Sequence, residues 1–263
     1  MIITNLTEII IGLDSKSIAA IIVFTALTLV LNLSPIKIPA PYAPFLIYQV
    51  WEIPIVAAFV LYGLKVGVPV AIINTLALLI IFPGALPTGP FYNLAAVLSM
   101  LFGIYIVQRV ASAFRSPNNE YVIEATTYLF LIMLSVIAAF VQSILWLLPG
   151  IVFSLLLLMV IGENWSKRTV ITLPNHSSLS GRSEALLVTT CTVVGTLTRV
   201  VAMIVVNGFF LPFPPPIGFA FPREAVIAII PFVGLFNATL ALYTIPIGYS
   251  IARVVRPGLK STR

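Results

Sequence analysis

Residues Ala43 to Phe82 form a long apolar segment that reads APFLIYQVWEIPIVAAFVLYGLKVGVPVAIINTLALLIIF. Glu52 and Lys65 are its only charged residues. A helix needs about 20 apolar residues to cross a bilayer, so this stretch is long enough for two crossings. Gly63-Leu64-Lys65, near the middle, supplies a turn. The stretch therefore predicts a helical hairpin in a membrane.

The composition of the whole chain agrees with this interpretation. Of 263 residues, 60% are hydrophobic and 8% are charged, whereas a soluble domain carries about 25% charged residues. We expect an all-α polytopic protein, with residues 1–263 forming a single integral membrane domain. Further apolar runs predict one crossing each, except that Tyr121–Gly162 is long enough for a second hairpin, giving about eight spans in all: Ser17–Leu33, Tyr92–Ala111, Tyr121–Gly162, Glu184–Leu211 and Glu224–Ala252.

The positions of the basic residues predict the orientation of the chain. An even number of spans places both termini on one side, and assigning that side as cytoplasmic puts 11 of the 14 Lys and Arg residues there. Lys37 and Arg223 fall outside, and Arg199 lies within a span. Cytoplasmic loops of membrane proteins are enriched in Lys and Arg. We therefore expect a multi-pass cell-membrane protein with both termini cytoplasmic, and the net charge of +6 requires no nucleic-acid partner.

The loops on the predicted external side have an unusual composition. Three stretches, Ser34–Trp51, Pro83–Phe91 and Pro212–Arg223, hold 12 of the 20 prolines and only two charged residues. Proline lowers the entropy that a loop loses when it becomes ordered. Such loops are more typical of a preformed lid or pocket than of flexible connections.

Motifs for catalysis and energy coupling are absent from the sequence. It contains no nucleotide-binding P-loop, no H-E-x-x-H and no G-x-S-x-G. One cysteine, Cys191, and one histidine, His176, offer no cluster of metal ligands. We expect no enzyme activity, no cofactor and no metal, and the chain lacks the means to drive transport with ATP by itself.

Polar residues gather at the predicted external ends of the spans. Glu52 begins a helix, so its carboxylate could cap that helix or contact a ligand. A single Asn in a span more often forms a hydrogen bond between helices than a contact with a ligand. Several amides beside aromatic rings favour a pocket, because amides supply donors and acceptors and rings can sandwich a flat solute. The residues in question are Asn93, Asn207 and Asn237, with Tyr48, Trp51, Tyr92 and Phe209.

Arg199 is the most costly residue of the chain, because it lies deep in a predicted span. Helical spacing places it on one face with Gly195, Met203 and Asn207. Two roles remain open for its guanidinium. One is a structural ion pair, for which Glu52 is the leading external carboxylate, and the other is binding of an anionic ligand.

The order of these segments resembles that in the substrate-binding S components of ECF-type vitamin transporters, most closely the riboflavin branch. The likeness rests on the aromatic–acidic–proline segment around Trp51, the Gly63…Gly67 turn, Gly89…Asn93, Met203…Asn207…Pro212 and Ile230-Pro231-Phe232…Asn237. It covers residues 17–111 and 184–255. Residues 121–162 would then be a transmembrane hairpin inserted into a six-helix core.

The resemblance implies a function and a set of partners. A vitamin, with riboflavin favoured, would bind from outside beneath the loop after the first helix. A transmembrane coupling subunit and two ATPase subunits would then drive its release into the cell. Carried over by position, the pocket would be lined by Tyr48, Trp51, Glu52, Asn93, Asn207 and Asn237.

The residues themselves indicate a solute-binding membrane subunit that depends on partners. The main alternative is a self-sufficient secondary transporter or channel for a small solute. Such a transporter typically contains an internal repeat and discontinuous helices, and we find no repeat between the two halves of the sequence. An intramembrane enzyme is a third possibility, and the lack of a second carboxylate deep within a predicted span, or of a histidine in one, argues against it.

Overall fold

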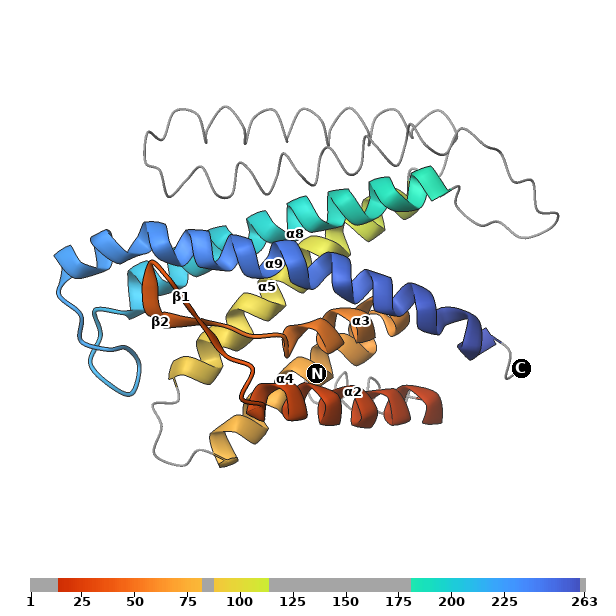
Figure 1. Cartoon of the computed structure of the whole chain (residues 1–263), viewed down its shortest axis with the longest axis horizontal. Coiled ribbons are helices and arrows are strands. Elements are labelled where there is room, and N and C mark those ends of the chain that lie inside the picture. The colour runs from red at the N-terminus through yellow and green to blue at the C-terminus, as the bar shows by residue number, and fades with distance from the viewer. Residues whose placement is uncertain (1–13, 82–87, 114–180, 261–263) are drawn as a thin grey trace, which may run out of the picture.

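The computed structural model describes residues 14–81, 88–113 and 181–260. This part of the chain forms six helices and one β-hairpin: α2 (Ser15–Leu33), β1 (Ile38–Ala40), β2 (Ala43–Tyr48), α3 (Glu52–Tyr62), α4 (Leu64–Ile81), α5 (Thr88–Ala113), α8 (Gly181–Phe210) and α9 (Arg223–Lys260). The helices run lengthwise through the molecule (Figure 1). The β-hairpin lies toward the end where α5 and α9 begin, which we call the hairpin end (Figure 1).

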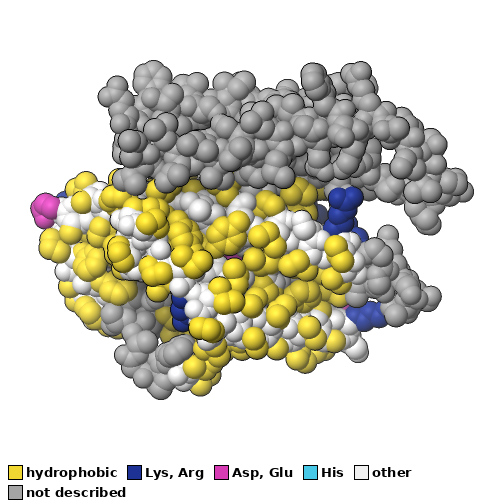
Figure 2. Space-filling model, viewed as in Figure 1, with side chains coloured by type: hydrophobic (Ala, Val, Ile, Leu, Met, Phe, Trp, Pro, Cys, Tyr) yellow, Lys and Arg dark blue, Asp and Glu magenta, His cyan; other side chains and the backbone are white. Residues whose placement is uncertain are grey.

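The described helices have the lengths and surfaces of membrane spans. Five of them, α2, α4, α5, α8 and α9, are long and apolar enough to cross a bilayer. Large apolar side chains point outward, as at Ile22, Ile80 and Val205, and apolar groups cover most of the described surface in Figure 2. Buried polar side chains lie inside, as at Thr28 and Asn74. The all-α membrane class agrees with the structure, whereas the predicted hairpin Tyr121–Gly162 lies outside the described residues.

The first half of Ala43–Phe82 differs from the prediction. The turn at Gly63 is confirmed, with a φ of 76°. The segment before it is no full crossing, because α3 has only 11 residues, or about 16 Å at 1.5 Å per residue. Residues 43–48 instead form β2, which pairs antiparallel with β1 so that Ile38 lies opposite Tyr48. This short pairing is interrupted between Pro39 and Ala40, and the chain then enters α3 at Glu52.

Glycines hold the middle of the bundle together. A Cβ atom at Gly103 of α5 would lie 2.9 Å from Cα of Gly195 in α8, so the two helices are in backbone contact there. A Cβ atom at Gly67 of α4 would lie 2.6 Å from Cβ of Phe59 in α3. The predicted Gly63-x-x-x-Gly67 element therefore supplies both a turn and a close approach of the two helices.

Candidate functional site

The hairpin end encloses a cavity of about 420 Å³, which is within the usual range for small-molecule sites. Its walls come from β2, the start of α3, the first turns of α5, the end of α8, the loop that follows α8, and α9. Most lining side chains are apolar or aromatic, including Trp51, Phe219, Phe221 and Phe236. The polar lining side chains are Gln49, Glu52, Tyr92, Asn93, Arg199, Asn207 and Asn237.

The structure brings six of the seven predicted site residues to this cavity: Trp51, Glu52, Asn93, Arg199, Asn207 and Asn237. The seventh, Tyr48, is not among the lining residues. Its ring packs against Phe236 of α9 with centroids 5.0 Å apart, and its hydroxyl lies 2.5 Å from that of Tyr42. Tyr48 therefore holds the β-hairpin against α9. Phe209, an aromatic neighbour in the sequence interpretation, is 61% exposed and also lies outside the lining.

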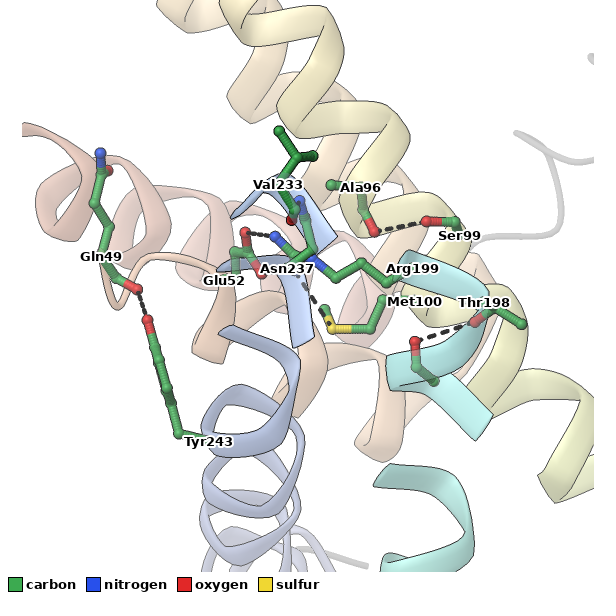
Figure 3. Close-up of polar contacts among 11 residues, drawn as sticks. Gln49, Glu52, Ala96, Ser99, Met100, Thr198, Arg199, Val233, Asn237 and Tyr243 are labelled. Carbon is green, nitrogen blue, oxygen red and sulfur yellow. Dashed lines mark hydrogen bonds and ion pairs between the residues drawn. The ribbon is translucent and has the colours of Figure 1, made fainter. Parts of the chain in front are cut away.

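A buried ion pair forms the floor of the cavity. Arg199 donates from Nη1 and Nη2 to the two carboxylate oxygens of Glu52, with Nη2 and Oε1 2.9 Å apart. Its Nε donates to Oδ1 of Asn237 at 2.9 Å (Figure 3). Arg199 and Glu52 are each 2% exposed. Of the two roles left open for Arg199, the geometry is that of the ion pair, and the Glu52 carboxylate faces Arg199.

Helical spacing explains how α8 and α9 reach this floor. Arg199, Met203 and Asn207 follow one another at four-residue intervals and all three line the cavity, while Gly195 at the same spacing meets α5. Asn207 Nδ2 donates to the backbone oxygen of Met203 at 2.8 Å. Asn237 Nδ2 likewise donates to Val233 at 2.9 Å. Each amide thus binds its own helix with its nitrogen and presents its side-chain oxygen elsewhere.

Two polar groups of the wall were not predicted to bind a ligand, namely the Gln49 side chain and the hydroxyl of Tyr92, a residue that the sequence analysis named only for its aromatic ring. Oε1 of Gln49 and the hydroxyl oxygen of Tyr92 are buried without a hydrogen-bond partner in the described part of the chain. The backbone oxygen of Gln49 is bonded, because it accepts from the Tyr243 hydroxyl at 2.6 Å (Figure 3). The sequence signal for both was their position beside Trp51 and Asn93.

The loop between α8 and α9 closes one side of the cavity. The backbone N–H groups of Phe219 and Phe221 both donate to the oxygen of Leu211, at 3.2 and 3.1 Å. A Cβ atom at Gly218 would collide with the backbone oxygens of Phe210 and Phe213. This proline-rich stretch is therefore folded compactly, as its composition predicts. Residues 83–87 of the stretch Pro83–Phe91 lie outside the described residues.

Metal chemistry gains no support from the described residues, among which no group of three or more His, Cys, Asp or Glu side chains could hold a metal ion. The single buried thiol of this part, Cys191, accepts a hydrogen bond from the Tyr249 hydroxyl at 3.2 Å. Neither residue lines the cavity.

Comparison with known proteins finds a solved structure with a similar fold. No protein-family model matches the chain, and no curated protein matches it. A solved structure of the S component of a bacterial ECF transporter is similar, with a TM-score of 0.53 and 18% sequence identity. The alignment covers 93% of this chain and 98% of that chain. At this identity the likeness concerns the fold, and the fold is that of an S component.

Proposed function

We propose that the protein is the substrate-binding membrane subunit of an ECF-type importer. In this proposal it captures a vitamin, with riboflavin favoured, from the external side. A transmembrane coupling subunit and two ATPase subunits then complete uptake. The observation that carries the proposal is the cavity of about 420 Å³ at one end of a bundle with an S-component fold. Its aromatic walls suit a flat ring, and its size suits a small solute.

The alternative, a self-sufficient secondary transporter, finds less support in the site. Proton- or sodium-coupled transport uses carboxylates that bind and release the ion within the membrane. In the described residues, Glu52 is the carboxylate of the cavity, and it is bound by Arg199. A coupling ion could bind this carboxylate only by breaking its bidentate pair with Arg199, which would leave the buried guanidinium without its partner. The dependence on partner subunits is therefore the favoured interpretation.

Fluorescence titration tests the site directly. Trp51 lines the cavity and is 4% exposed, so riboflavin bound there should quench its emission, and Trp51→Phe should remove most of the signal. Asn207→Ala should lower affinity about 5- to 150-fold, because a polar group of the ligand would lose its partner, at a cost of about 1–3 kcal/mol. Unchanged binding by both variants would contradict the proposed site.

Asn74→Ala is the matched control for that titration. Asn74 is a buried asparagine of α4 that pairs with Asn32 at 3.5 Å and does not line the cavity. Its loss should alter stability and leave riboflavin affinity within about twofold. Equal losses of affinity from Asn74→Ala and Asn207→Ala would place the site elsewhere in the bundle.

Transport assays test whether uptake by this protein requires the coupling and ATPase subunits. The purified protein alone, in proteoliposomes, should take up no riboflavin under a proton or sodium gradient and should hydrolyse no ATP. Uptake should appear when the coupling and ATPase subunits are reconstituted with it. Robust uptake by the isolated chain under an ion gradient would favour the secondary transporter instead.

Accessibility labelling tests the proposed orientation, in which the hairpin end faces outward and both termini are cytoplasmic. Lys37 lies beside the β-hairpin and Lys65 begins α4 at the opposite end, and both side chains are exposed. Cysteine at position 37 should react with an impermeant thiol reagent in intact cells, and cysteine at position 65 only after lysis. The reverse pattern would invert the topology.

A further inference from the structure

The polar groups that line the cavity fall into two sets with different hydrogen bonding. The floor consists of Arg199, Glu52 and Asn237, which bind one another. The wall includes Gln49 and Tyr92, whose buried polar atoms have no partner in the described part of the chain. The two sets place different demands on a ligand.

The floor has little capacity left for a charged ligand. All three guanidinium nitrogens of Arg199 donate to protein atoms, and both carboxylate oxygens of Glu52 accept from it. The two formal charges cancel within the pair. A ligand carboxylate would have to displace Glu52, and a ligand cation would have to displace Arg199. Either exchange leaves a buried charge without its partner, which is strongly unfavourable.

The wall, by contrast, has unused capacity for uncharged groups. Native proteins rarely leave buried polar atoms without a hydrogen bond, and such atoms call for an explanation. The Gln49 amide and the Tyr92 hydroxyl can each donate and accept. They come from different elements, Gln49 from the link between β2 and α3 and Tyr92 from the first turns of α5. A ligand that satisfied both would touch two walls of the cavity.

We propose that the cavity takes an uncharged solute whose polar edge is hydrogen-bonded by Gln49 and Tyr92. The closed cluster of Arg199, Glu52 and Asn237 rejects anionic and cationic solutes. This inference rests on the proposed function and narrows its substrate class. It assigns Arg199 the part of a positioning residue, which holds Glu52 and Asn237 in place and makes no direct contact with the ligand.

A panel of matched vitamins tests the charge rule. Nicotinamide and nicotinate share a ring and differ in an amide and a carboxylate, as do biotinamide and biotin. Riboflavin adds an uncharged tricyclic ring, and thiamine adds a cation. Native mass spectrometry of the full chain with each probe should detect binding of one or more uncharged members and of no charged member.

Each result of the panel has a distinct meaning. Detectable binding of nicotinate, biotin or thiamine would overturn the inference and leave the proposed function standing. Binding of no member would contradict the proposed vitamin-binding function and the inference with it. Binding restricted to uncharged members supports both.

Two substitutions then test the residues, with the tightest uncharged probe of the panel. Gln49→Leu and Tyr92→Phe should each weaken binding about 5- to 150-fold, because a ligand polar group loses its partner in a dry site. The Tyr92 hydroxyl has no protein partner in the described part, so Tyr92→Phe should leave the melting temperature of the unliganded protein unchanged or raised. Loss of affinity without loss of stability is the expected signature.

The controls lie on α5, away from the cavity. The Tyr105 hydroxyl accepts from Arg109 at 2.8 Å, and Gln108 donates to the Tyr249 hydroxyl at 2.8 Å. Neither lines the cavity, so Tyr105→Phe and Gln108→Leu should keep full affinity even where stability falls. Unchanged affinity in both Gln49→Leu and Tyr92→Phe would overturn the assignment of these residues.

Discussion

The middle of the bundle and its hairpin end use the same helices in opposite ways. At Gly195, α8 lies against Gly103 of α5, where a Cβ atom on Gly103 would be only 2.9 Å from Cα of Gly195. At Gly208, about 20 Å further along α8, a Cβ atom would meet only the tip of Ile230 at 3.8 Å. The middle is closed by small residues, whereas the hairpin end is held open by aromatic and amide side chains around a cavity.

The ion pair of Arg199 and Glu52 lies at the boundary between these two regions. Arg199 is one helical turn from Gly195, and both it and Glu52 line the cavity. This difference shows that one membrane bundle can combine a closely packed region and a cavity at different points along its length. On one side of the pair the helices are in close backbone contact, and on the other side, in the proposed function, the side chains around the cavity recognise the ligand. Substitutions in each region test whether the two regions are separate in this way.

Breaking the ion pair of Arg199 and Glu52 should have the largest effect on stability. Arg199→Met leaves the Glu52 carboxylate buried without its partner, which costs about 3–5 kcal/mol. We expect a large fall in the melting temperature of the detergent-solubilised protein. The double variant Arg199→Met/Glu52→Leu removes both charges and should recover much of the stability. A double variant less stable than Arg199→Met would show that the two residues do not act as a pair.

A smaller effect on stability is expected from adding a methyl group where α5 and α8 are in backbone contact. Gly103→Ala places a methyl group 2.9 Å from Cα of Gly195 and from the backbone oxygen of Val194. Overpacking of this kind costs about 1–3 kcal/mol. Gly208→Ala is the matched control, because the same change there meets open space and gains about 0.5–1 kcal/mol of helix propensity. Opposite shifts in melting temperature would support the separation, and equal shifts would refute it.

The smallest effect on stability should come from weakening the contact between the β-hairpin and α9 at the cavity. Tyr48→Leu removes the ring contact with Phe236 and the hydroxyl contact with Tyr42. An aromatic pair contributes about 0.5–1.5 kcal/mol, so the global melting temperature should change little. Amide hydrogen exchange in β1 and β2 should become faster. Ile36→Ala, at a residue 54% exposed just before β1, should leave that exchange unchanged.

Much of this arrangement could be predicted from the sequence, because membrane helices carry strong local signals. Length and hydropathy place α2, α4, α5, α8 and α9 within a few residues, and Gly63 marks its turn. Composition also indicates that the loop after α8 is ordered. Helical spacing places Arg199, Met203 and Asn207 on one face. These features depend on neighbours in sequence, so the sequence alone contains them.

The remaining features depend on which helices meet, which periodicity does not specify. The sequence left Arg199 with two possible roles, because pairing with Glu52 requires that two side chains 147 positions apart in the chain meet in the bundle. It gave no sign of β1 and β2, since residues 43–48 continue an apolar run without alternation. The Gln49 amide and the Tyr92 hydroxyl were not recognised, although the Tyr92 ring was, because nothing local to them shows that their polar atoms are buried without a partner in the described part of the chain.

The ion pair of the cavity floor also has a consequence for biosynthesis. Glu52 and Arg199 are 147 positions apart in the chain. At about 5–20 residues per second, Glu52 emerges from the ribosome roughly 7 to 30 s before its partner. During that interval the carboxylate has no arginine to bind, and a charged side chain in the bilayer is costly. The ion pair can therefore form only after Arg199 has been synthesised, so the floor of the cavity is completed late in the synthesis of the chain.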